Sequence, residues 1–220
     1  MTPVPLIYFI RHGQNQANVD RVLAYKAVDH PLTDRGAKQA AALGRWFLGR
    51  QLACVYTSPL VRARQTAQVV AEATGAPLVV RDELRELNVG ELDGRGDKES
   101  WALHDEVVAR WRQGDADARF PGGEDYHQAY ARLAGLVEEV VALHPDADAA
   151  LVGHGGLFTS VLPRLCPVPD YDWTEQLKLG NTAVTVLRHD GGSFAWELWG
   201  GLDHLPVELQ SGGAASPPRT

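Results

Sequence analysis

The stretch LIYFIRHG, residues 6–13, decides the fold that we expect for this chain. It belongs to an apolar run over residues 4–10, and a run without polar alternation predicts a strand that is covered on both faces. Such strands are typical of the parallel sheets of α/β proteins. Arg11, His12 and Gly13 follow at the carboxyl end of the strand, which is the edge where open α/β sheets bind ligands.

Outward from this strand, short apolar runs alternate with helical patterns. Two alternating runs near the end of the chain are joined by Asp190-Gly191-Gly192 and predict a β-hairpin. We therefore expect a three-layer α/β/α sandwich around a mostly parallel, partly mixed central sheet. The further strands are predicted at residues 54–57, 78–80, 149–152, 182–188 and 193–199.

Capping residues and glycine indicate where the helices begin and end. Thr33, Ser58 and Asp125 are expected to cap the helices that follow them, and Gly75 to stop the second of these. Further helical patterns lie around residues 100–112 and over 124–144 and 157–165. On the first helix, core-facing spacing is shared by Ala40, Leu43, Phe47 and Leu48.

Composition sets the broad class of the protein. The 220 residues are 45% hydrophobic and 22% charged, with a mean hydropathy of −0.22, which predicts one globular domain over residues 1–210 and a disordered tail over 211–220. A net charge of −7 argues against a nucleic-acid partner, although an acidic protein can still hold a small cationic pocket. Two cysteines, no signal-peptide pattern and no long apolar run predict a cytoplasmic protein without disulfides or membrane contact.

Two histidines share one sequence context. His12 and His154 each come directly after a predicted strand and are flanked by glycine, which lets the backbone approach a ligand. A lone histidine at a strand end is most often a hydrogen-bonded loop residue. Two of them converge on one site if their strands are neighbours in the sheet.

An arginine pair lies near a third strand end. Arg62 and Arg64 fall in the helix that follows strand 54–57, and they diverge by about 200° around a helix. At most one of them therefore faces inward, and the other belongs to a solvated helix face.

These residues belong to four motifs that resemble the histidine phosphatase superfamily, the phosphoglycerate-mutase-like proteins. The motifs are Arg11-His12-Gly13 with Asn18, SPLVRARQTA at 58–67, LRELNVGELDG at 84–94 and VGHGG at 152–156. The resemblance runs from Ile7 to about Leu205, nearly the whole chain.

The resemblance implies a role for each matching residue. His12 would be the nucleophile that takes a phosphoryl group on a ring nitrogen, and Arg11, Arg62 and His154 would form the cationic pocket around it. Arg64 would then point outward. Glu86 matches the proton donor of the family, while Asn18 and the backbone at Gly13 and Gly155 would add phosphate contacts.

The residue types suit this chemistry. Phosphoryl transfer needs positioning and cationic stabilisation of equatorial oxygens, which guanidinium groups supply at any working pH. The neighbouring positive charges should also disfavour protonation of His12 and keep it nucleophilic. From the residues alone, Glu86 reads as a loop carboxylate paired with Arg85, and Glu83 and Glu91 are alternatives as the acid.

Some positions depart from the family pattern. Asn15 stands where the family commonly has Thr or Ser, the family often has Gly near Ala24-Tyr25, and Asp125 stands where it has Ser. Substrate choice is expected from residues 91–125 and 168–180, which contain Trp101, Trp111, Tyr171 and Trp173.

Three functions remain open at this level. A phosphatase acting on a small phosphorylated substrate is favoured, because the basic residues of the short segment 91–125 are diluted by acidic ones. A cofactor-dependent phosphoglycerate mutase is the first alternative, and a non-catalytic phosphate-binding module is the second. The eight histidines show no metal-binding spacing, so neither a metal nor another cofactor is expected, and the protein would be a monomer or homodimer.

Overall fold

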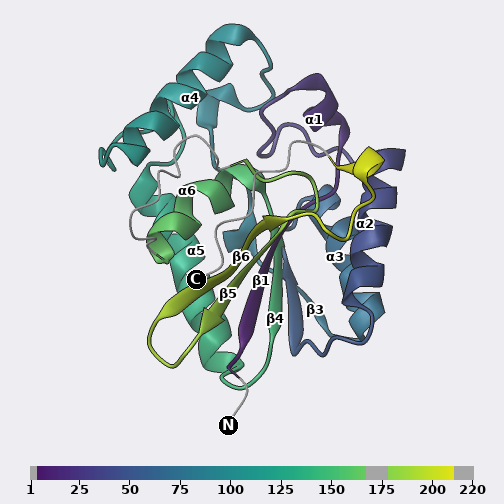
Figure 1. The fold of residues 1–220 in the computed structure, drawn as a ribbon. Coiled ribbons are helices and arrows are strands. Elements are labelled where there is room, and N and C mark those ends of the chain that lie inside the picture. Colours follow the sequence, from purple (N-terminus) through teal and green to yellow (C-terminus); the bar gives the residue numbers. More distant parts are fainter. Residues whose placement is uncertain (1–3, 167–177, 211–220) are drawn as a thin grey trace.

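Six strands form a single sheet in the computed structural model, which describes residues 4–166 and 178–210. Across the sheet the strand order is β3-β2-β4-β1-β5-β6 (Figure 1). The strands are β1 (Leu6–Arg11), β2 (Cys54–Thr57), β3 (Leu78–Val80), β4 (Ala149–Gly153), β5 (Val184–His189) and β6 (Phe194–Gly201).

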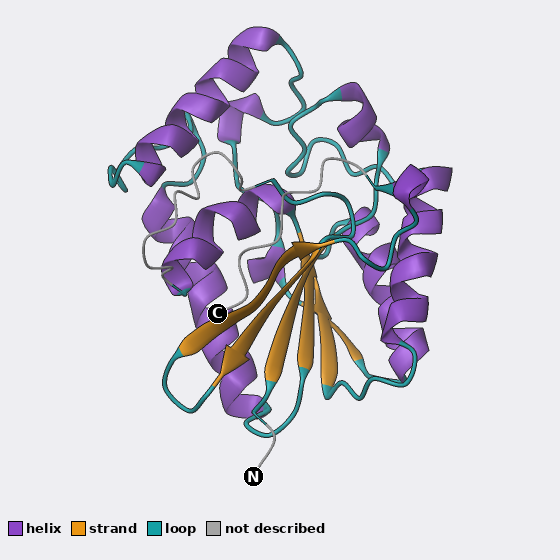
Figure 2. Cartoon of the chain, in the orientation of Figure 1, coloured by secondary structure: helices purple, strands orange, loops and turns teal. Residues whose placement is uncertain are grey.

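Helices cover both faces of this sheet, which gives the expected three layers (Figure 2). Helices α2 and α3 pack together on one face, α5 and α6 lie on the other, and α1 and α4 lie beyond the ends of the strands. The helices are α1 (Gln16–Asp20), α2 (Asp34–Phe47), α3 (Val61–Thr74), α4 (Lys98–Arg112), α5 (Tyr126–Leu143) and α6 (Gly155–Leu165).

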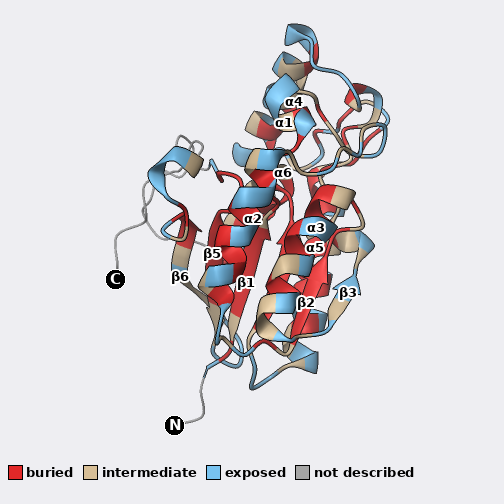
Figure 3. Cartoon of the chain, turned by 90° about the vertical axis from the view of Figure 1, so that its right-hand side faces the viewer, coloured by how far each residue is buried: buried red, intermediate tan, exposed pale blue. Residues whose placement is uncertain are grey.

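Strand β1 is buried from both sides, as its apolar sequence predicts. Ile7 and Phe9 pack into the core beneath α5 and α6, whereas Tyr8 and Ile10 pack into the core beneath α2 and α3. Successive side chains of a strand point to opposite faces, so an unbroken apolar run fills both cores at once. Figure 3 shows this burial in red along the middle of β1, whose end residues Leu6 and Arg11 are only partly buried.

The pairing of the strands is mixed. Strand β1 runs parallel to β4, with Arg11 opposite Gly153, and β4 runs parallel to β2. On its other side β1 pairs antiparallel with β5, and β5 pairs antiparallel with β6, so the predicted hairpin forms the antiparallel edge. The carboxyl ends of β1, β2 and β4 therefore meet at one edge of the sheet.

Most of the predicted caps are confirmed and one is wrong. The side chains of Thr33 and Asp125 accept from the backbone of their helices, and Gly75 ends α3 with a φ of 72°. Ser58 does not cap α3, whose N-cap position is Leu60 without a side-chain hydrogen bond. Because β2 ends at Thr57 and α3 begins only at Val61, Ser58 lies in the turn between them.

One predicted core residue of α2 is also wrong. Ala40, Leu43 and Phe47 are buried, but Leu48 is 64% exposed. The helix ends at Phe47, and the backbone of Leu48 leaves the helical conformation, so helical spacing no longer sets its direction. In the described part of the chain no helix is long and apolar enough to cross a membrane. The predicted tail at 211–220 lies outside the described residues.

Candidate active site

A cavity of about 570 Å³ lies at the edge of the sheet where β1, β2 and β4 end. Its lining brings together residues that are far apart in the sequence and that include most of the predicted site. The predicted residues in the lining are Arg11, His12, Asn18, Arg62, Glu86 and Gly155.

His12 follows β1 and is held in one orientation at the floor of the cavity. Its side chain is buried, with 3% of the residue exposed, and its backbone N–H donates to Gly153 O of β4 at 3.0 Å. The ring Nδ1 lies 2.7 Å from Gly13 O, while Arg62 Nε donates to Nε2 at 3.3 Å. This pattern makes Nδ1 the protonated nitrogen and leaves the lone pair on Nε2.

The electrostatic surroundings keep His12 neutral. Burial lowers the pKa of His12 well below its usual range, and the guanidinium groups of Arg62 and Arg11 lower it further. The expected effect of the positive neighbours is therefore confirmed in direction, with burial as the larger cause. A neutral imidazole keeps a lone pair on Nε2, which here accepts only the long hydrogen bond from Arg62 Nε, and this is the nucleophilic form.

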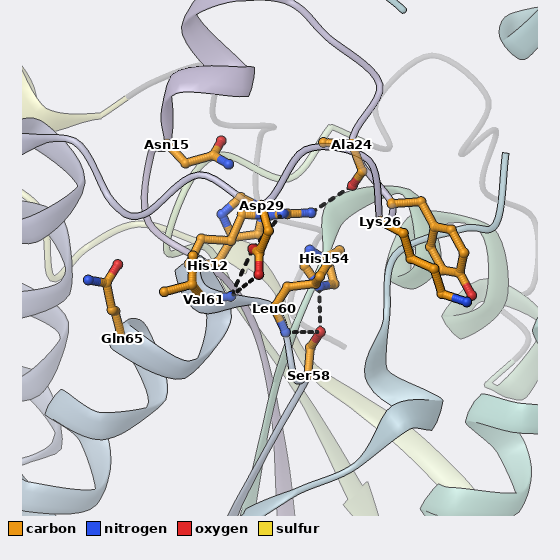
Figure 4. A network of polar contacts seen from close by, with 12 residues as sticks. His12, Asn15, Ala24, Lys26, Asp29, Ser58, Leu60, Val61, Gln65 and His154 are labelled. Atoms are coloured by element: carbon orange, nitrogen blue, oxygen red, sulfur yellow. Dashed lines mark hydrogen bonds and ion pairs between the residues drawn. The ribbon is translucent and has the colours of Figure 1, made fainter. Parts of the chain in front are cut away.

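Arg62 lies in the first turn of α3 and is the inward arginine of its motif. It is 2% exposed, whereas Arg64 is exposed, as the geometry of a helix requires. Its Nη2 donates to Ala24 O at 2.8 Å, and its Nη1 lies 3.7 Å from Asp29 Oδ1. Asp29 also accepts from Val61 N, so one carboxylate orients the arginine and caps its helix (Figure 4).

The loop that carries Ala24 is fixed by Asp93, which belongs to the same sequence motif as Glu86. The carboxylate of Asp93 accepts hydrogen bonds from the backbone N–H groups of Tyr25, Lys26 and Ala27 at 2.7–2.8 Å. Tyr25, near which the family often has Gly, packs against the core and does not line the cavity.

Arg11 and the glycine of VGHGG depend on each other. Arg11 Nη1 donates to Leu179 O, which turns the guanidinium across the start of α6. A Cβ at Gly155 would lie 3.1 Å from Arg11 Nε, so a larger residue there would push the guanidinium aside. Burial lowers the pKa of Arg11, and the nearby Glu86 carboxylate opposes this effect.

His154 follows β4 and lies beside His12, as neighbouring parallel strands require. The two ring centroids are 5.1 Å apart, and His154 is fully buried. Its Nε2 lies 2.8 Å from Ser58 Oγ (Figure 4), and no described residue bonds its Nδ1. Burial, with a further contribution from Arg62, lowers the pKa of His154 well below its usual range.

Glu86 reaches the cavity from the loop after β3. Its Oε1 accepts from Leu157 N at 2.7 Å and from Leu87 N at 2.9 Å, and its Oε2 accepts from Gly156 N at 3.0 Å. The N-terminus of α6 thus holds the carboxylate. A Cβ at Gly156 would lie 2.7 Å from Glu86 Oε1, so this second glycine keeps the approach open.

Two asparagines at the start of α1 form a reciprocal cap. Asn15 Oδ1 accepts from Asn18 N at 3.1 Å, and Asn18 Oδ1 accepts from Asn15 N at 3.2 Å. This explains Asn15, which sequence alone left without a role. Asn18 Oδ1 also accepts from Asn181 Nδ2 at 3.0 Å, so the donor that Asn18 can offer a ligand is its amide nitrogen.

Sequence reasoning missed Asn181 and misjudged Gly13. Asn181 lines the cavity, and its Nδ2 also donates to His12 O at 3.2 Å. Its only signal was a polar residue just before a buried strand. The Gly13 N–H donates to Thr66 Oγ1 at 3.0 Å, and a Cβ there would lie 2.8 Å from Gly36 O. Gly13 therefore serves packing against α2, not contact with a ligand.

The outer part of the cavity is lined from α4 and the loop after α1. Trp101 Nε1 donates to Arg21 O at 2.6 Å, and the Trp101 ring meets the His104 ring edge to face. Trp111, from the same predicted specificity segment, is 2% exposed and belongs to the core. Tyr171 and Trp173 lie outside the described residues.

The lining is cationic although the chain as a whole is acidic. Arg11, Arg21, Arg62 and Lys178 face a single carboxylate, Glu86, among the described lining residues. No group of three His, Cys, Asp or Glu side chains that could hold a metal ion occurs in the described residues. An anionic ligand is therefore the one that this cavity attracts.

Fold and site together define an α/β protein with a cationic pocket built around a neutral, buried histidine. The chain belongs to the histidine phosphatase superfamily (branch 1), whose family model matches residues 7–201.

The chain is similar to known proteins over most of its length. It is 30% identical to phosphoglycerate mutase-like protein 4 of Arabidopsis thaliana, over 94% of this chain and 90% of the relative. It is 28% identical to a putative phosphoserine phosphatase 2 of Hydrogenobacter thermophilus, over 84% and 90%. A mycobacterial glucosyl-3-phosphoglycerate phosphatase of known structure is 30% identical, with a TM-score of 0.75 over 89% of this chain and 98% of that chain. The predicted fold and family are thus confirmed.

Proposed function

We propose that this protein is a metal-independent phosphatase that hydrolyses phosphate monoesters through a phosphohistidine on His12. The observation that carries the proposal is the fixed orientation of the His12 ring. Gly13 O accepts a hydrogen bond from Nδ1–H, and Nε2 lies at the cavity floor beside Arg62. A nucleophile, its orienting acceptor and a cation for the phosphoryl oxygens are thereby assembled in one place.

In the first step, His12 Nε2 attacks phosphorus and the bond from phosphorus to the ester oxygen breaks. The phosphoryl oxygens lie against Arg11, Arg62 and Asn18 Nδ2, which bind charge as it spreads over them. Glu86 in its acid form gives its proton to the leaving alcohol oxygen. The products of this step are the free alcohol and a phosphohistidine.

In the second step, water attacks the phosphohistidine. Glu86, now a carboxylate, accepts the water proton, and the bond between phosphorus and His12 Nε2 breaks to release inorganic phosphate. His154 is fully buried and, unlike the other predicted site residues, does not line the cavity, so it acts from behind His12 with an Nδ1 that no described residue bonds. The bound dianion favours protonation of His154, which then adds a further cation.

The segment 91–125 supports hydrolysis over a mutase reaction. A mutase must hold a second anionic group of a bisphosphate, which requires additional cations at the cavity. In this segment Arg95, Arg110 and Arg119 pair with carboxylates of their own segment. The described lining contains no lysine or arginine from residues 91–125, and its cations beyond Arg11 and Arg62 are Arg21 and Lys178.

Trapping of the intermediate tests the proposal. Incubation with an aryl phosphate and acid-free quenching should give a phosphoprotein that is labile to acid and stable to alkali, with the phosphate on His12. Turnover should persist in EDTA. Loss of turnover in EDTA would instead indicate a metal enzyme, and isomerisation of 3-phosphoglycerate that depends on a bisphosphoglycerate would support the mutase.

A screen of phosphorylated metabolites ranked by kcat/KM would identify the substrate. The relatives named above include proteins named for phosphoserine and for glucosyl-3-phosphoglycerate, so both esters belong in the screen. The 570 Å³ cavity has room for an alcohol group well beyond the phosphoryl group.

A further inference from the structure

A largely buried ion pair lies behind the loop that carries Glu86, and 19% of its arginine side chain is exposed. Arg132 of α5 forms a bidentate ion pair with the carboxylate of Glu124. Its Nη2 donates to Oε1 at 2.8 Å and its Nε donates to Oε2 at 3.1 Å. Glu124 is 7% exposed, and neither residue lines the cavity. Removing two such charges from water is costly, so the pair requires compensating hydrogen bonds.

Those compensating bonds all go to one stretch of backbone. Arg132 Nη1 donates to Glu83 O at 2.6 Å and to Arg85 O at 2.8 Å, and its Nη2 donates to Glu86 O at 3.1 Å. Glu124 Oε1 accepts from Asn88 N at 2.9 Å, and Glu124 N donates to Asn88 O at 2.9 Å.

Most of this stretch has no regular structure of its own to set its position. Residues 85–89 belong to neither helix nor strand, so their polar backbone groups need partners from elsewhere. Arg132 and Glu124 supply partners from residue 83 to residue 88. The guanidinium is a planar fork, and a lysine at this position could not reach the same set of carbonyls.

Glu86 is thereby held from two sides. Arg132 binds its backbone carbonyl from behind, and the N-terminus of α6 binds its carboxylate in front. A proton donor must come within hydrogen-bond distance of the leaving oxygen, and a displacement of about 1 Å can cost a hundred-fold in rate.

We propose that Arg132 and Glu124 are positioning residues that place Glu86 for proton transfer to the leaving alcohol. They act through the backbone of residues 83–88 and touch no substrate. This inference rests on the proposed function, in which Glu86 is the acid.

The leaving group provides the test. p-Nitrophenolate leaves without protonation, whereas the alkoxide of glycerol 2-phosphate needs a proton, so only the second ester depends on a well-placed Glu86. The quantity to compare is kcat/KM, because it reports transfer to His12 and excludes hydrolysis of the common phosphohistidine. The measured quantity is the ratio of kcat/KM for glycerol 2-phosphate to kcat/KM for p-nitrophenyl phosphate. In Arg132→Lys and in Glu124→Gln this ratio should fall about ten-fold or more below the wild-type ratio.

Arg119→Lys is the matched control. Arg119 lies in the segment just before α5, pairs with the carboxylate of Asp125 and donates to Gly123 O, and its side chain is not among the hydrogen-bond or ion-pair partners of residues 83–88. The ratio of the two kcat/KM values should stay at the wild-type value in this variant. Both rates are measured on one sample, so a partly unfolded fraction cancels in the ratio. If Arg132→Lys does not fold, Glu124→Gln by itself tests the positioning role.

A second comparison shows whether the pair acts through Glu86. In a Glu86→Gln background, where no carboxylic acid remains to be placed, adding Arg132→Lys should leave the ratio unchanged. An equal fall for both esters in Arg132→Lys and Glu124→Gln would mean that the pair only stabilises the fold, and would overturn the inference while the proposed function stands. A wild-type protein that hydrolyses neither ester would overturn the proposed function and the positioning role together.

Discussion

Arg62 at the floor of the cavity and Arg21 at its mouth carry the same charge in opposite settings. Arg62 is 2% exposed and contacts His12, Ala24 and Asp29, whereas Arg21 is exposed. At the floor, buried side chains are fixed by the ends of β1 and β4, the following turn and the first turn of α3. At the mouth, partly exposed side chains come from α4 and a loop. For the proposed reaction, a fixed floor suits the phosphoryl group, which all substrates share. The more exposed mouth suits the alcohol group, which differs between substrates.

The largest expected effect is at the floor. His12→Ala removes the atom that accepts the phosphoryl group, so kcat/KM for p-nitrophenyl phosphate should fall at least roughly 1,000-fold. The same variant should give no trapped phosphoprotein. His104→Ala at the mouth is the control, and a His12→Ala protein that retains turnover would show that the nucleophile lies elsewhere.

Arg62→Lys should cost less, but still about a hundred-fold in kcat/KM. A lysine keeps the charge, yet it cannot contact His12 and Ala24 together while presenting a fork to phosphate oxygens. Inhibition by inorganic phosphate, measured in parallel, should weaken as well. Arg64→Lys, two residues away on the exposed face, should leave both quantities unchanged, and equal losses in the two variants would contradict the inward assignment.

The buried histidines should make the protein less stable in acid. Burial lowers the pKa of His12 and of His154 well below the ordinary value, and lowers the pKa of His204 to about 4. As the pH falls below about 6.5, these side chains take up protons in the unfolded chain before they do so in the folded protein, so acidification favours unfolding. Each histidine can contribute up to about 1.4 kcal/mol per pH unit within its window.

Chemical denaturation at pH 7.5 and pH 5.5 would measure this loss. His204 lies outside the cavity, with Nε2 3.1 Å from Thr182 Oγ1, so His204→Gln removes one titrating group and keeps a donor. The variant should lose less stability between the two pH values than the wild type. An identical loss would show that His204 does not contribute.

The smallest effect is expected at the mouth. Trp101→Ala removes an aromatic wall and its bond to Arg21 O, so KM for esters of bulky alcohols should rise by roughly ten-fold or less. Competitive inhibition by inorganic phosphate should stay within about two-fold of the wild-type value, because phosphate occupies only the floor. A large loss of phosphate binding would show that floor and mouth are not separate.

Sequence alone predicted the elements that local patterns specify. The apolar run before Arg11 predicted a strand buried on both faces, and the spacing of Arg62 and Arg64 predicted that only one faces inward. The paired glycine-flanked histidines predicted one site, on the condition that β1 and β4 are neighbours. These inferences succeed because strand and helix periodicity determine direction from the sequence itself.

Where several segments meet, the pattern was insufficient. Ser58 looked like a helix cap but contacts His154, and Gly13 looked like a ligand contact but packs on Gly36. Asn181 carried almost no signal, because its partners Asn18 and His12 lie more than 160 positions away. Hydrogen bonds at such separations leave no periodic trace in a sequence.

What the sequence by itself determined was therefore the class of fold, the family and the residue types of the candidate site. Only the tertiary structure decided which nitrogen of His12 is available, what holds Glu86 and which side chains line the mouth. The physical reason is that strand and helix directions follow from neighbouring residues, whereas the placement of the Glu86 side chain depends on groups supplied by three separate segments. Here those segments are the loop of residues 83–88, the start of α6, and Glu124 with Arg132.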